Sequence, residues 1–136
     1  MNIENFKRDH LTVSGKVGEL RRLVQAGIAD NADDIASIVV SMNHTIKLHL
    51  AAEDRVLYPA LTRSNNNSAT QMARKYQTEM GSIAAAYNDF SLKWNVGSRV
   101  EADPEEFRRA ANQVFKALHE RIQREDKHLY PLAEQV

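Results

Sequence analysis

The chain has 136 residues, in which 18 Lys and Arg balance 18 Asp and Glu, and it contains no cysteine. A net charge of zero argues against a nucleic-acid or anionic-membrane surface, because such surfaces need a basic field. Without cysteine, a metal site has to be built from His, carboxylate or Met side chains. No stretch is apolar enough to span a bilayer, and the N-terminus lacks the apolar core of a signal peptide. We therefore expect a single cytoplasmic domain over residues 1–136.

Apolar residues recur at helical spacing in four segments, which are separated by short polar breaks. We expect Asn31 to cap the second helix, a capping box of Ser68 and Gln71 to open the third, and Asp103 to cap the fourth. Four helices of roughly 25 to 30 residues with short connections predict an all-α, up-down-up-down four-helix bundle. The first predicted helix runs from residue 4 to about 28, and the second begins after Asn31. The third runs from Ser68 to about Gly97, and the fourth begins at Pro104.

The sequence contains an internal repeat. Residues 53–59, Glu-Asp-Arg-Val-Leu-Tyr-Pro, recur as residues 125–131, Glu-Asp-Lys-His-Leu-Tyr-Pro, at an offset of 72. The helices that precede the two copies also align, at an offset of 70, so that Phe6 corresponds to Tyr76 and Val24 to Trp94. The chain is therefore predicted to consist of two similar helical hairpins, and a central site should receive matched contributions from both.

Six polar residues interrupt the apolar stripes, and all are expected at one end of the bundle. Buried His and carboxylate groups are costly unless they are paired or bind a cation. His49 and Glu53 are four residues apart and share a helical face, and Glu125 and His128 form a Glu-x-x-His pair that points two ligands the same way. The candidate residues are His10, His49, Glu53, Arg121, Glu125 and His128.

These motifs resemble the hemerythrin-like family, the bacterial HHE cation-binding bundles. The resemblance rests on Asp9-His10, on His-Leu-Ala-Ala-Glu-Asp at 49–54 with Leu-Tyr-Pro at 57–59, and on Glu-Asp at 125–126 with Leu-Tyr-Pro at 129–131. It implies a non-haem di-iron centre between four helices, bridged by two carboxylates and capped by histidines. It also implies that the protein binds oxygen, responds to nitric oxide or oxidants, or handles iron.

Two positions depart from the family pattern. Arg121 stands where the family has a His four residues before the second bridging carboxylate, and Met80 stands where the repeat would place the counterpart of His10. Arginine has no lone pair to offer a cation and stays protonated in proteins. We therefore expect a degraded di-iron site that binds at most one divalent metal, iron first, in a sensor or binding protein for oxygen, nitric oxide or iron.

Three arrangements of the site follow from the sequence. In the first, Arg121 replaces metal and pairs with Glu53 and Glu125, in a metal-free bundle that works through its surface as a homodimer or adaptor. In the second, His10, His49, Glu53 and Glu125 hold one divalent ion and Arg121 lies aside or holds a carboxylate. In the third, His128 supplies a substitute ligand and a displaced two-metal site survives.

Signatures of common catalytic sites are not visible in the sequence. There is no nucleophile–His–acid set and no glycine loop that would hold a phosphate. The expected binding partner is a metal ion or a small diatomic ligand, and an iron enzyme acting on peroxide or nitric oxide remains a further alternative. His44 and His119 lie off the apolar stripes and are expected at the surface.

Overall fold

The computed structural model describes residues 1–136 and is all-helical, with no strand. No helix in it is both long and apolar enough to cross a bilayer. The long helices are α1 (Glu4–Ala26), α2 (Ala32–Ala52), α4 (Asn67–Lys93) and α6 (Pro104–Arg124). The short ones are the π-helix η1 (Glu53–Leu57), α3 (Tyr58–Thr62), α5 (Gly97–Ala102), the π-helix η2 (Glu125–Leu129) and α7 (Tyr130–Glu134).

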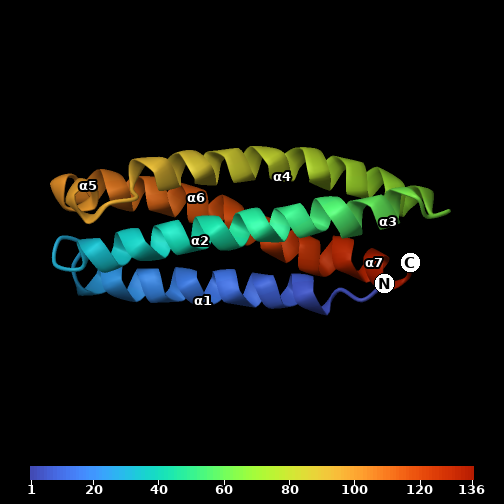
Figure 1. Ribbon diagram of the computed structural model, residues 1–136, viewed down its shortest axis with the longest axis horizontal. Helices are drawn as coiled ribbons and strands as arrows, with labels where there is room; N and C mark the ends of the chain where they lie inside the picture. Colours follow the sequence, from blue (N-terminus) through green and yellow to red (C-terminus); the bar gives the residue numbers. More distant parts are fainter.

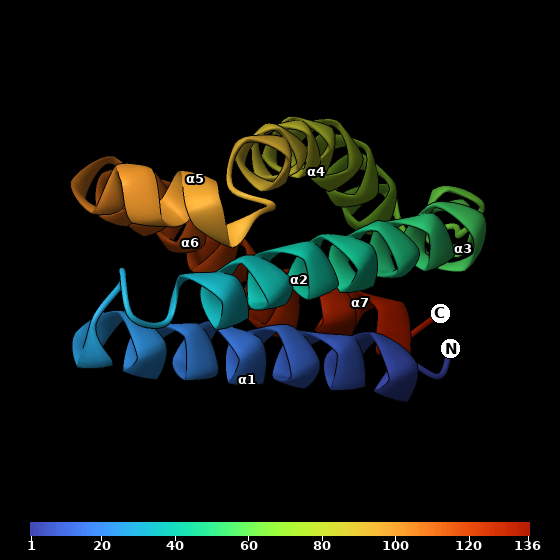
Figure 2. The ribbon, with the colours of Figure 1, turned by 60° about the vertical axis from the view of Figure 1, so that its left-hand side comes forward.

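The four long helices lie side by side along the length of the molecule (Figure 1), an arrangement consistent with a bundle. Helix α1 packs on α2, and α4 packs on both α6 and α2; Figure 2 shows the same neighbours from another direction. The two chain ends meet, because the amino group of Met1 donates a hydrogen bond to the carbonyl of Val136 (3.2 Å). Both Tyr-Pro motifs lie at this end of the molecule, since they open α3 and α7.

The helix caps agree with the sequence at one of three predicted positions. Asp103 accepts a hydrogen bond from the backbone of Glu106 (3.2 Å), as expected. The third long helix is capped by Asn66 instead of Ser68, because the Asn66 side chain accepts from the Ala69 backbone (3.1 Å). Asn31 precedes α2 but makes no cap, because its amide donates to a carbonyl of the preceding turn.

The α5 turn, which the sequence did not indicate, depends on a close approach of backbones. Gly97, its first residue, is buried against the start of α2. A Cβ at this position would lie 2.9 Å from Asp33 Cα and still closer to the Asp33 carboxylate. Only glycine lets the two segments meet at this separation.

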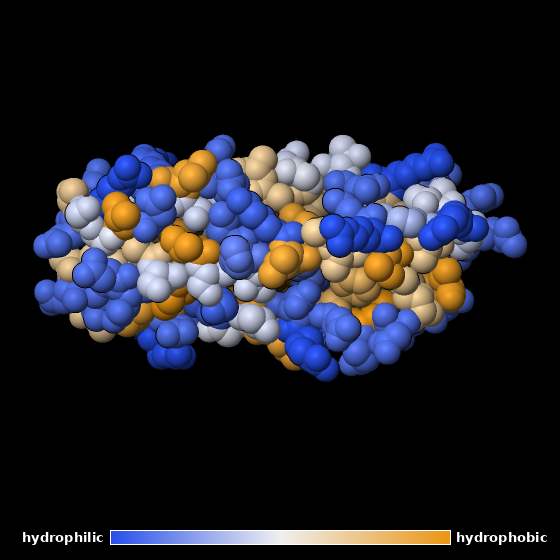
Figure 3. All heavy atoms as spheres, viewed as in Figure 1, coloured by the Kyte–Doolittle hydropathy of each residue, from blue (hydrophilic) through white to orange (hydrophobic).

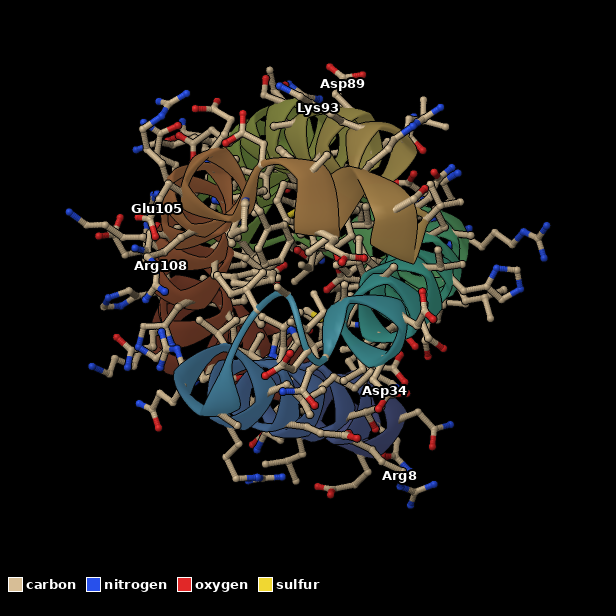
Figure 4. All side chains as sticks on the ribbon, turned by 90° about the vertical axis from the view of Figure 1, so that its left-hand side faces the viewer. Arg8, Asp34, Asp89, Lys93, Glu105 and Arg108 are labelled. Carbon is tan, nitrogen blue, oxygen red and sulfur yellow. The ribbon has the colours of Figure 1, made fainter.

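Apolar side chains fill the interior in two clusters, with the polar candidate residues between them along the helices. The larger cluster includes Val39 and Phe107, and the smaller one lies toward the chain ends around Leu57 and Leu129. Burial of each large apolar side chain stabilises the fold by about 1.5–3 kcal/mol. Charged side chains cover the outside, as for Arg108 in the end-on view of Figure 4. The face in Figure 3 is mostly hydrophilic, with single hydrophobic residues at its left and adjoining ones at its lower right.

Both helices that carry the repeat motif widen into one π-helical turn before their proline. The backbone N–H of Tyr58 donates to the carbonyl of Glu53, five residues earlier, and Tyr130 does the same to Glu125. Proline lacks an N–H and its ring clashes with the carbonyl four residues before it, so a wider turn relieves an otherwise broken helix. Such turns frequently occur at functional sites.

The extra residue in each π turn rotates the side chains that follow. Leu57 and Tyr58 face the interior, and Val56 is turned out to 50% exposure. In the second copy Leu129 and Tyr130 are buried, and His128 is exposed. A regular helix would have kept His128 on the inner stripe, where its spacing predicted it.

Candidate metal centre

Four of the five predicted metal ligands lie together inside the molecule. His10 comes from α1, His49 from α2, and Glu53 and Glu125 are the first residues of the two π turns. Each offers a ligand atom, and these atoms all lie within 4.8 Å of one another. None of the four residues is more than 5% exposed. A single cation placed among them would contact ligands from three separate parts of the chain.

Each histidine is oriented by an aspartate outside the group. His10 Nδ1 donates to Asp126 Oδ1 (2.8 Å), and His49 Nδ1 donates to Asp9 Oδ2 (2.9 Å). Both aspartates are partly exposed, so each carboxylate contacts solvent and also accepts a hydrogen bond from a buried imidazole. A carboxylate on Nδ1 sets the tautomer that leaves Nε2 free for a metal and increases its basicity.

The Tyr130 hydroxyl contacts three of the four residues of the group. It donates to Glu53 Oε2 (2.9 Å) and lies 3.0 Å from His10 Nε2 and 3.4 Å from His49 Nε2. Its ring stacks on the His10 imidazole at 5.1 Å between centroids. Burial, with the negative charge of the two glutamates, raises the pKa of this phenol, so it stays protonated and acts as a donor.

The charges of the group are strongly interdependent in the metal-free protein. Burial lowers the pKa of His49, but the Glu53 carboxylate beside the ring, with Oε1 3.3 Å from Nε2, outweighs burial and raises the pKa to about 9. Burial likewise opposes protonation of His10, and Glu125 raises its pKa overall. Burial and the neighbouring Glu53 raise the pKa of Glu125, whereas His49 holds the pKa of Glu53 down despite burial. A bound cation would replace these protons.

The residues present fit a divalent metal ion. Glu125 Oε2 accepts no hydrogen bond, and Glu53 Oε1 lies 3.3 Å from His49 Nε2 but accepts no well-directed one. A buried carboxylate oxygen without a donor is costly, and a cation would satisfy it. Two imidazoles and two carboxylates are a donor set suited to Fe(II), Mn(II) or Zn(II).

Arg121 is buried but does not contact the two glutamates, which corrects the first of the three sequence-based arrangements. Its Nη1 donates to Glu79 Oε2 (2.8 Å), and its Nη2 donates to the backbone carbonyl of Tyr76. The guanidinium lies over the Tyr76 ring, with Cζ 4.0 Å from the centroid. The predicted ion pairs with Glu53 and Glu125 are absent, because the tyrosine ring and Glu79 on α4 hold the guanidinium.

Comparison with known families explains this set of residues. The family model described as the hemerythrin HHE cation binding domain matches residues 1–133. The chain belongs to the hemerythrin family. Searches of curated proteins and of solved structures gave no match. The family description as cation binding agrees with a buried His and Glu group that is able to hold a metal.

Two positions of this hemerythrin domain lie outside the four-residue group. His128, predicted as a fifth ligand, is exposed because the π turn rotates it off the inner face, and the metal group does not include it. Met80 is buried on α4, where the repeat places the counterpart of His10. Both histidines of the four-residue group therefore come from the first hairpin.

Three residues of the site had no role assigned from the sequence. Asp9 and Asp126 belong to the motifs that mark the hemerythrin resemblance, but only the structure shows that each orients a histidine. Tyr130 belongs to the repeated Leu-Tyr-Pro motif, whose duplication was the available signal. Its inward direction depends on the π turn, which periodicity alone does not reveal.

Proposed function

We propose that this hemerythrin-like domain, an up-down-up-down four-helix bundle over residues 1–136, binds one divalent metal ion. The proposed ligands are His10, His49, Glu53 and Glu125, and iron is the ion typical of the family. The observation that supports this most directly is the enclosure of these four side chains, with their ligand atoms within 4.8 Å of one another. Asp126 and Asp9 each accept a hydrogen bond from Nδ1 of one histidine, an arrangement typical of metal-binding histidines.

A second metal is disfavoured by the other hairpin. Arg121 brings a fixed positive charge, buried to 1% exposure, where the family has a histidine ligand. Met80 adds only a thioether, which is a poor ligand for hard divalent ions. One metal per chain is therefore the stoichiometry that we propose.

We further propose a sensor or binding role, with oxygen, nitric oxide or iron as the ligand or signal. A cavity of about 220 Å³, between α1 on one side and the end of α6 with η2 on the other, is lined by His10, Lys7 and Asp126, among others. The four proposed ligands are buried, so only a small molecule or ion would reach them from this cavity. Such access suits a diatomic molecule or a bare ion.

Metal analysis of protein purified without oxygen from iron-fed cells tests the proposal. We expect one metal per chain in the parent protein and in His44→Ala, which removes an exposed histidine from the same helix as His49. His49→Ala should lose the metal. Two irons per chain with the visible spectrum of an oxo-bridged pair would contradict the single-ion site.

The same protein distinguishes the metal-free alternative, a bundle that works through its surface. A ligand bound only by the native state adds stability, so a chelator should lower the melting temperature by several degrees if the metal is present. No change on chelation, together with metal-free protein from iron-fed cells, would favour the interaction module. The ion pairs that this alternative predicted for Arg121 do not form.

A further inference from the structure

A groove runs between α1 and α6 along most of the length of α1. Helix α1 packs closely on α2 but makes few contacts with α6. Three cavities, of about 240, 210 and 220 Å³, lie between the two helices, the third of them beside His10. Buried apolar side chains, among them Leu20, Phe115 and Leu118, line the groove. The two helices are therefore separated by an open apolar groove for most of their shared length.

The cavities repeat with the period of a helix. The first and second share Arg21 and Phe115 in their walls. The second and third share Ser14 and Ile122. These two pairs are seven residues apart on α1 and also seven residues apart on α6. Seven residues make two helical turns, or about 10 Å. A helix lying in the groove would therefore place its side chains i, i+7 and i+14 in successive cavities.

Each cavity has room for a large apolar side chain. A cavity of about 150 Å³ holds a benzene ring, and all three cavities exceed this volume. Leu11 lines the third cavity and is 74% exposed, which makes it the most exposed large hydrophobic residue of the chain. A helix that inserts Leu or Phe side chains into the groove would also cover Leu11.

The charge along the groove favours an acidic partner. Three basic residues, Lys7, Arg21 and Arg108, line it, and Arg108 projects outward from α6 in Figure 4. The ion pairs of Lys7 and Arg108 are exposed and contribute little, and Arg21 forms none. The one acidic residue of the lining, Asp126, already accepts a hydrogen bond from His10. Carboxylates of a partner would thus meet basic side chains along the length of the groove.

We propose that the groove between α1 and α6 binds an amphipathic helix of a partner protein, with acidic residues flanking its apolar face. A helix of about 19 residues matches the groove, which α1 lines over residues 7–25. A second copy of this chain fits less well. Helices α1 and α6 both carry more basic than acidic residues, so two copies packed groove to groove would repel each other. The inference does not depend on the proposed metal ion.

The test uses the full chain and a synthetic helical peptide of this length as the probe. The peptide has Leu at i, i+7 and i+14 and on the turns between them, with Glu on both sides of the Leu face. A second peptide carries Lys in place of every Glu. Fluorescence anisotropy at low ionic strength gives the Kd of each peptide. We expect the Glu peptide to bind at least about tenfold more tightly than the Lys peptide.

Gly18→Leu tests whether the middle cavity receives a side chain of the partner. Gly18 lines this cavity, and a Cβ there would meet no atom within 4 Å, so the new side chain fills the groove without a clash. It should weaken binding of the Glu peptide about tenfold or more. Gly15→Leu is the matched control, because Gly15 is equally unobstructed but lines none of the three cavities. Its Kd should equal that of the parent, and circular dichroism checks that both variants fold.

Arg21→Glu tests the charge of the groove. It should weaken binding of the Glu peptide about tenfold and strengthen binding of the Lys peptide by a similar factor. Arg22→Glu makes the same change of net charge at an exposed residue outside the three cavities. It should change both Kd values much less.

Several outcomes would overturn the proposal. One is a parent protein that does not bind the Glu peptide, or that binds both peptides equally. Equal effects of Gly18→Leu and Gly15→Leu would place the peptide elsewhere on the surface. A long-chain fatty acid that binds where the peptide does not, and that Gly18→Leu excludes, would assign the groove to an acyl chain. A dimeric parent that Gly18→Leu makes monomeric in size-exclusion chromatography would assign it to a second copy.

Discussion

Arg121 is hydrogen-bonded to Glu79 in the second hairpin as His49 is hydrogen-bonded to Asp9 in the first. The repeat offsets of 72 and 70 residues relate these two pairs to each other. The second hairpin has therefore lost its histidine but kept the carboxylate that would orient one. Asp54, the counterpart of Asp126, is also present and now accepts a hydrogen bond from Gln77 on α4.

This relationship predicts that a second metal site is recoverable. Met80→His combined with Arg121→His should raise the stoichiometry from one metal per chain to two, because Asp54 and Glu79 are in place to orient the new rings. The measurement is metal content after reconstitution with iron(II) or cobalt(II) under nitrogen. Arg121→His alone is the matched control and should bind less than two. A double variant with no more metal than the parent would show that the repeat does not extend to the site.

The aspartates outside the metal group should affect metal affinity. Asp126→Asn removes the charge that orients His10 and should weaken zinc(II) binding about 10- to 100-fold. Asp54→Asn is the matched control at the equivalent position of the repeat, where Met80 offers no ring to orient, and should leave the affinity unchanged. Competition with a chromophoric chelator measures both. Equal losses in the two variants would assign the effect to surface charge.

The two repeat tyrosines should differ in their contribution to stability. In metal-free protein, Tyr58→Phe removes a buried hydroxyl without a partner and should raise the free energy of unfolding by about 1 kcal/mol. Tyr130→Phe removes a donor to the Glu53 carboxylate and should lower it by about 1.5–3 kcal/mol. Urea unfolding in excess chelator measures the free energy of unfolding of both variants. A lower value for Tyr58→Phe than for the parent would mean that this hydroxyl has a hydrogen-bond partner.

Metal affinity should rise with pH. The pKa of His49 is raised to about 9 in the metal-free protein, so below this pH the imidazole carries a proton that an incoming metal has to displace. Zinc(II) affinity should increase by about tenfold per pH unit for each proton released, and this increase should level off above pH 9. Calorimetric titration in two buffers of different ionisation enthalpy counts the protons. An affinity that is constant between pH 6.5 and 8.5 would contradict the raised pKa.

Much of the architecture and most of the proposed ligand set could be predicted from the sequence alone. Helical spacing of apolar residues predicts the all-helical structure, because each helix has to bury one face. His10, His49, Glu53 and Glu125 stand on these faces as polar exceptions, and their gathering in the structure agrees with that pattern. The hemerythrin resemblance is confirmed, because the family model matches residues 1–133.

Contacts between groups on different helices depend on the tertiary packing, which the sequence does not reveal. Because Arg121 stands where the family has a metal ligand, one predicted arrangement paired it with Glu53 and Glu125. Packing of α6 against α4 pairs it with Glu79 instead. The π turn before each proline shifts the inner face by one residue, which buries Tyr130 and exposes His128. A pattern of constant period contains no record of such a turn, because its cause is a local conflict between proline and the helix backbone.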